Sequence, residues 1–229
     1  MLMHKVRQRR GHQRGLSVVE LMVGIAVGLF VVSAAVLMIS TQLGDTRRLL
    51  LETQLQQDLR AASDIIAREL RRASAWGSAS MTIWRPGQTT NVTSNPFGAV
   101  TAQDEGAGID FRYQRRPGEE GPYGFMVAEG GILKSRLGLA GWQELTDADV
   151  MNVTQFNVEL TDERSDPLPC PTACADGTTD CWPRVVTRTA RIDIAAQARS
   201  DSQIQRTVTT YVRLRNDKVE FNNGADICP

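Results

Sequence analysis

The sequence predicts an α+β fold in which one long N-terminal helix packs on an antiparallel β-sheet. Three observations lead to this prediction. An uncharged, apolar segment of 24 residues runs from Leu21 to Gly44. A stripe of apolar residues at helical spacing follows it over residues 51–70. Most of the remaining chain consists of short segments that alternate apolar and polar residues, as strands with one buried face do.

Composition argues against nucleic acid as the main ligand. The chain has 229 residues, which is enough for one medium domain with an appendage. It carries 26 basic and 26 acidic side chains. Five basic residues and no acidic ones precede Leu16, so 21 basic and 26 acidic residues remain after it. A mildly acidic body gives no electrostatic reason to bind nucleic acid or anionic lipid. The five residues are Lys5, Arg7, Arg9, Arg10 and Arg14.

The two histidines, His4 and His12, both lie before Gly15. A chain cut after Gly15 would contain no imidazole, which Ser-His-Asp and Cys-His catalysis and most zinc sites require. We therefore expect a protein that is not an enzyme and that carries no cofactor and no metal.

The apolar segment is long enough to cross a membrane, since about 20 such residues span the hydrocarbon core of a bilayer. The five N-terminal positive charges outnumber Arg47 and Arg48 beyond its other end. This excess of basic residues places residues 1–15, the basic leader, in the cytoplasm and the body outside. A buried core helix is the alternative interpretation.

The junction before this segment is unusual for an exported protein. Gly15 directly precedes Leu16, where the predicted apolar helix begins, and Glu20 is the fifth residue after that glycine. A basic leader, a glycine, a glutamate five residues on and an uninterrupted apolar helix together resemble a type IV prepilin. The resemblance implies that a prepilin peptidase cuts between Gly15 and Leu16 and that Leu16 is N-methylated, while the helix is kept. Leu16 and Leu37 stand where major pilins usually have phenylalanine and proline, which favours a minor pilin.

Glu20 has two interpretations. It lies one turn into the helix, where the helix dipole and the headgroups tolerate an acid. Alternatively, the resemblance implies that it pairs with the N-terminal amine of Leu16 in a neighbouring subunit and thereby sets the register of assembly. Gly24 and Gly28 have the spacing that lets membrane helices approach closely, although glycine is common in such helices.

The apolar stripe predicts that the helix continues beyond the membrane. Its residues recur at steps of three and four, so they share one face. We expect one helix over Leu16–Ala75, apolar over 16–44 and amphipathic over 45–75, with the stripe covering the protein's own sheet rather than forming a coiled coil. The stripe consists of Leu51, Leu55, Leu59, Ala62, Ile66 and Leu70.

Residues 76–229 are expected to form a β-rich body outside the cytoplasm. The part from Trp76 to Asp104 is rich in turn-forming residues and predicts a long connecting loop with short strands. The last two predicted strands alternate clearly and are joined by a short turn, which favours a long antiparallel hairpin. The predicted strands are Ile109–Gln114, Phe125–Ala128, Ile132–Ser135, Met151–Leu160, Val185–Ala198 and Gln203–Leu214.

Four cysteines, Cys170, Cys174, Cys181 and Cys228, lie in this body, and three of them fall in an insertion near 165–183. Outside the cytoplasm, cysteines favour disulfides, and four allow three pairings. One bond could close the insertion and another could tie Cys228 to the body. An all-cysteine zinc site, or calcium at Asp176 and Asp180, are alternatives that the spacing favours less.

Among type IV prepilins, the stretches LSVVELMVGIAVGLF, LQQDLRAASDIIARELRRASAWG and TTYVRLRN look most like PilW-like minor pilins. The similarity is strong over residues 11–77 and faint over the last hairpin. It implies a single-pass inner-membrane protein with a periplasmic body that joins a type IV pilus, used in adhesion or twitching motility, with prepilin peptidase and other minor and major pilins as partners. Because Glu20 is present, it also implies a position beneath another subunit. A type II secretion pseudopilin and a membrane-anchored adhesin or binding protein are the alternatives.

Overall fold

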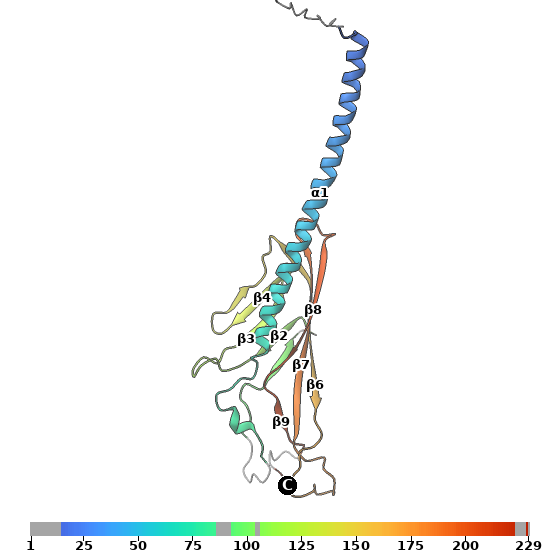
Figure 1. The fold of residues 1–229 in the computed structure, drawn as a ribbon. Coiled ribbons are helices and arrows are strands. Elements are labelled where there is room, and N and C mark those ends of the chain that lie inside the picture. Colours follow the sequence, from blue (N-terminus) through green and yellow to red (C-terminus); the bar gives the residue numbers. More distant parts are fainter. Residues whose placement is uncertain (1–14, 86–92, 104–105, 223–227, 229) are drawn as a thin grey trace, which may run out of the picture. The chain divides into compact units, whose positions relative to one another are not determined.

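The computed structural model describes residues 15–85, 93–103, 106–222 and 228. Figure 1 shows a long helix, α1, and a body built from strands. The chain divides into two compact units, residues 1–49 and residues 50–229. The long N-terminal helix and the antiparallel strands confirm the predicted α+β class, although the strands form two sheets and not one.

Helix α1 spans Val18–Leu70, which is shorter at both ends than the predicted Leu16–Ala75. Its C-terminal end is set by tertiary contacts and not by glycine or proline. Ala73 N donates to Leu70 O over 3.0 Å, a bond that tightens the last turn, and Ser74 then adopts a left-handed conformation with φ of 65°. The Ser74 N–H donates to Arg112 O over 2.8 Å, so the chain leaves the helix by bonding to a segment that is distant in sequence.

The first sheet contains five antiparallel strands in chain order. The short strand β1 lies in the connector that was expected to contain short strands, whereas β5 was not predicted. Strand β2 ends three residues before the predicted limit of Gln114. Before β1, a 3₁₀ helix spans Ala79–Thr82 within the predicted connector. The strands are β1 Val100–Gln103, β2 Gly108–Phe111, β3 Tyr123–Ala128, β4 Ile132–Leu137 and β5 Trp142–Glu144.

The second sheet has the order β6-β7-β8, and β9 also pairs with β7. The predicted hairpin is confirmed as the antiparallel pair of β7 and β8, while β6 runs four residues further than predicted. All pairings are antiparallel, and a bulge lies in β6 between Val153 and Gln155. The strands are β6 Met151–Arg164, β7 Arg184–Ala198, β8 Gln205–Arg213 and β9 Lys218–Glu220, the last of which was not predicted.

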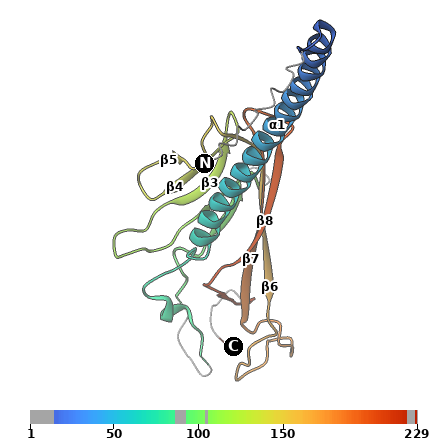
Figure 2. The same ribbon diagram turned by 45° about the horizontal axis from the view of Figure 1, so that its top comes forward.

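The amphipathic half of α1 packs on both sheets and forms the centre of the core. Leu55, Leu59, Ile66 and Leu70 are at most 1 % exposed. Within the body, this part of the helix lies across strands of both sheets in Figure 1, and Figure 2 shows the same arrangement from another side. The predicted stripe is therefore the contact with the protein's own sheets. Buried partners from the sheets include Ile109, Phe111, Phe125, Leu133, Val158, Ile192, Ile194 and Val212.

Polar contacts fix the same half of the helix against the sheets. The Ser63 and Thr210 hydroxyls are 2.6 Å apart, and Arg206 forms an ion pair with Glu52. The Tyr113 hydroxyl donates to Glu69 Oε2 over 2.7 Å, and burial raises the pKa of Tyr113. These contacts are directional, so they define how the helix is rotated on the sheets.

The first prediction concerns this core. Leu59→Ala should lower the free energy of unfolding by about 2–5 kcal/mol, because it leaves a cavity under the fully buried helix face. Leu139→Ala is the matched control, since Leu139 is 95 % exposed in the turn between β4 and β5, and it should change stability by less than about 0.5 kcal/mol. Urea unfolding of the full chain in detergent micelles, followed by tryptophan fluorescence, measures both. Equal effects would show that the helix does not rest on the sheets as described.

Candidate functional site

The first half of α1 exposes apolar side chains on every face. Phe30 is 76 % exposed and Leu37 69 %, and every described residue from Gly15 to Leu50 is exposed. Within the part of the chain that the structure describes, α1 is the one helix long and apolar enough to cross a membrane. A surface this apolar is not stable in water, so lipid or other apolar helices must cover it.

The few polar groups of this segment bond within the helix. The hydroxyl groups of Ser33 and Ser40 donate to the carbonyl oxygens of Leu29 and Val36, over 2.8 and 2.9 Å. Thr41 Oγ1 donates in the same way to Met38 O. These hydroxyls need no partner from water, which makes the segment compatible with the interior of a bilayer. Glu20 is the single charged residue from Gly15 to Gly44.

The structure places the predicted processing and assembly residues at the start of this segment. Gly15 and Leu16 precede the helix, and Glu20 lies in its first turn. Glu20, Gly24 and Gly28 follow one another at steps of four, so they share one face of α1. A Cβ atom added at Gly24 or Gly28 would meet nothing within 4 Å, so the backbone on this face is open to a close neighbour.

Both disulfides lie in the body. Cys174 pairs with Cys181 across the insertion, and Cys170 pairs with Cys228 over 58 residues of sequence. This is one of the three pairings that the sequence allowed, and it leaves none of these cysteines as a zinc ligand. The two bonds close the insertion on itself and tie the C-terminal Cys228 to it.

The carboxylates of Asp176 and Asp180 contact other residues of the described insertion and of β7. Asp176 Oδ1 accepts hydrogen bonds from the backbone N–H of Thr178 over 3.0 Å and from its hydroxyl over 2.7 Å, and these bonds lower the pKa of Asp176. Asp180 lies 3.7 Å from Arg184. Both carboxylates therefore serve a polar turn inside the small disulfide loop.

The comparison with protein families identifies the body. The family model of prepilin peptidase-dependent protein B matches residues 48–214, which is nearly three quarters of the chain. The chain belongs to this family. It is therefore related to the type IV prepilins and is a pilin-like protein whose family name states dependence on prepilin peptidase. No curated protein and no solved structure matches the chain.

The family match and the N-terminal pattern are independent observations. The matched region begins at residue 48 and covers the amphipathic half of α1 and the strands up to β8. It does not include Gly15, Leu16 or Glu20. The processing and assembly roles predicted for these residues therefore rest on the sequence pattern and not on the family match.

Sequence reasoning missed a group of basic residues in the body. Arg164, Arg184, Arg188 and Lys218 line a cavity of about 690 Å³ beside β7 and β9. The stretch RVVTRTARI, at the start of β7, places two of its arginines an even number of residues apart, which could have indicated this group. Arg184 and Arg188 are six and two residues before Ala190 and thus share the buried face of an alternating strand.

The second prediction is the disulfide pairing. Digestion of the full chain under non-reducing conditions, followed by mass spectrometry, should yield one peptide pair linking Cys170 to Cys228 and one link between Cys174 and Cys181. We expect no free thiol at these four positions, because all four cysteines are disulfide-bonded in the structure. A link between Cys228 and Cys181, or free thiols in protein from its native host, would contradict the described insertion.

Proposed function

We propose that this protein is a minor pilin, a structural subunit of a type IV pilus that acts by assembly and not by catalysis. The observation that carries the proposal is that a chain with a fully exposed apolar half-helix belongs to a family named for its dependence on prepilin peptidase. A single charge, Glu20, stands in the first turn of that half-helix. The PilW-like resemblance of the N-terminal stretches supports the choice of a minor pilin.

The apolar half of α1 first holds the protein in the inner membrane. Its length and composition suit one crossing, and the basic leader keeps the N-terminus in the cytoplasm. Prepilin peptidase then cuts between Gly15 and Leu16, and the new amine of Leu16 is methylated. The cut removes the leader with its charges. The apolar helix stays in the membrane, and the body stays in the periplasm.

The same half-helix then exchanges lipid for neighbouring subunits. Each large apolar side chain covered by a neighbour contributes about 1.5–3 kcal/mol relative to exposure in water. Such contacts are as non-directional as contacts with lipid, so their free energy changes little when one helix shifts along the axis of another. The apolar surface therefore provides cohesion in the filament but does not select the offset between neighbours.

Glu20 selects that offset. Outside lipid, its carboxylate and the Leu16 amine of a neighbour attract each other by roughly 4 kcal/mol, for charges about 4 Å apart at an effective dielectric constant of about 20. Loss of one partner leaves the other charge buried and unpaired, which costs about 3–5 kcal/mol. The open face at Gly24 and Gly28 lets the neighbouring helix approach closely enough for this pairing.

The third prediction tests this charge. Glu20→Gln keeps the shape of the side chain and removes its charge, so the protein should still be cut and inserted in the membrane. Its amount in sheared pili from the native host should fall at least about tenfold, because the pair that sets the register is lost. Quantitative immunoblots of the pilus and membrane fractions measure the partition, and N-terminal sequencing should find methylated Leu16 first.

Ser33→Ala is the matched control, because the Ser33 hydroxyl already bonds to its own helix. It should enter pili like the wild type. Normal entry of Glu20→Gln into pili would contradict the proposed role of the charge. If wild-type protein never leaves the membrane fraction and its deletion blocks secretion of hydrolases, the protein is a type II secretion pseudopilin. If it stays in the membrane without a secretion defect, it is an anchored binding protein.

A further inference from the structure

The inner face of the second sheet changes character where the helix ends. Along β7, the residues that face the core are apolar at Ala190, Ile192 and Ile194, which the helix covers. The same face continues with Arg188 and Arg184, since alternate residues of a strand share a face. Helix α1 ends at Leu70 and does not cover this stretch.

Neighbouring strands add charges to that face. Arg164 of β6 and Lys218 of β9 both lie opposite Val186, on either side of β7. Glu220 of β9 lies opposite Arg184. Residues opposite each other in antiparallel strands point to the same side, and diagonal neighbours are about 7–8 Å apart, so the long basic side chains reach a common space.

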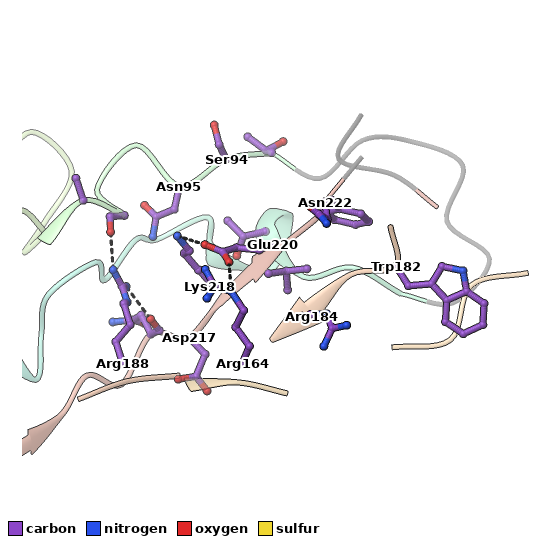
Figure 3. A pocket seen from close by; sticks show the side chains of 17 residues that line it. Ser94, Asn95, Arg164, Trp182, Arg184, Arg188, Asp217, Lys218, Glu220 and Asn222 are labelled. Atoms are coloured by element: carbon purple, nitrogen blue, oxygen red, sulfur yellow. Dashed lines mark hydrogen bonds and ion pairs between the residues drawn. The ribbon is translucent and has the colours of Figure 1, made fainter. Parts of the chain in front are cut away.

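This space is a cavity of about 690 Å³, within the usual size range of small-ligand pockets. Figure 3 shows Arg164 and Lys218 at Glu220, Arg184 between Arg164 and Trp182, and Arg188 at the other end of the cavity. The opposite wall comes from the loop before β1 and carries polar residues. They are Thr93, Ser94 and Asn95.

Positive charge exceeds negative charge at this cavity. Its described lining has four basic side chains but only two acidic ones, Asp217 and Glu220. Arg213, which pairs with Asp217 over 3.1 Å, and Asp162, which lies opposite Arg188, add one charge of each sign. Asp180, which lies 3.7 Å from Arg184, adds one further negative charge, so the excess is one positive charge.

Arg188 is the most buried of these groups, at 7 % exposure. It donates to neutral oxygens of Gly98, Ser74 and Asn216, over 2.6, 2.9 and 3.0 Å. No carboxylate of the described chain lies within ion-pair distance of it, and its Nε has no hydrogen-bond partner there. Burial lowers the pKa of Arg188, against the opposite effect of the nearby carboxylates of Asp162, Asp217 and Glu220.

Arg164 and Arg184 keep donors available at the cavity. Arg164 uses Nε for Glu220 Oε2 over 3.1 Å, which leaves its two terminal nitrogens for another acceptor. Arg184 donates to Ser165 O over 3.3 Å, and its contact with the exposed Asp180 is 3.7 Å long. Glu220 lies between Arg164 and Lys218 and accepts hydrogen bonds from both. The hydrogen bond from Lys218 is the main cause that lowers the pKa of Glu220.

We propose that this cavity binds the carboxylate group of a small organic acid between Arg164 and Arg184. The planar guanidinium fork matches a carboxylate through two parallel hydrogen bonds. The excess positive charge attracts the acid, and the polar wall accommodates the rest of a small polar molecule. The size of the cavity favours a small ligand over a protein segment. The site does not depend on the proposed role in pili.

The test is calorimetric titration of the full chain in detergent micelles with glutarate, and with glutaramide as the uncharged analogue of the same size. At an ionic strength of about 0.01 M, glutarate should bind with a dissociation constant of about 1 mM or lower. Glutaramide should bind at least tenfold more weakly. Arg164→Gln and Arg184→Gln should each weaken glutarate binding at least tenfold.

Arg191→Gln is the matched control, because Arg191 lies on the opposite face of β7 and the substitution removes the same charge. Its affinity for glutarate should equal that of the wild type. Thermal unfolding of each variant checks that the body is intact; if one of the two cavity variants is unfolded, the other carries the test.

Four results would overturn the proposal. They are no binding of glutarate by the wild type, equal binding of glutaramide, equal binding of inorganic sulfate, and an Arg191→Gln effect as large as that of Arg164→Gln. Binding of a glutamate-rich peptide without binding of glutarate would assign the cavity to a protein partner, and would also contradict it.

Discussion

Burial of one helix face against two sheets is the contact on which the structure depends. From Leu55 to Leu70, helix α1 places its apolar stripe in the only core formed by the described body, together with residues from both sheets. From Val18 to Leu49, every residue of the same helix is exposed, with apolar side chains all round. One continuous helix thus combines a half that its own chain covers with a half that another apolar environment must cover.

The proposed function follows from this division of the helix. The body can fold with its own core and disulfides, while the apolar half can pass from lipid to a bundle of like helices without changing its own hydrogen bonds. In the proposed assembly, apolar contact supplies most of the free energy and Glu20 supplies the specificity of position. This division also explains why a family match confined to residues 48–214 and an N-terminal pattern outside it point to the same class of protein.

Helices and the longest strands could be predicted because their patterns are local. The apolar run, the stripe and the alternation in the hairpin each repeat over many residues. The short strands β1, β5 and β9 have three or four residues, too few to show alternation, and the division into two sheets depends on distant pairings. The helix end at Leu70 depends on the bond between Ser74 and Arg112, which no local pattern reveals. The basic cavity was not predicted because the sequence alone did not show that α1 leaves the part of β7 around Arg188 uncovered.

The central claim is that the apolar half of α1 contacts other pilin-like subunits once it leaves the membrane. A photo-reactive amino acid at Phe30, which is 76 % exposed, tests it most directly in the native host. The protein should then form a covalent adduct with another prepilin-derived subunit in filaments, identified by mass spectrometry, whereas the same group at Leu139 in the body should not give that adduct. Filaments that contain the protein, yet give only lipid adducts from position 30, would contradict the account.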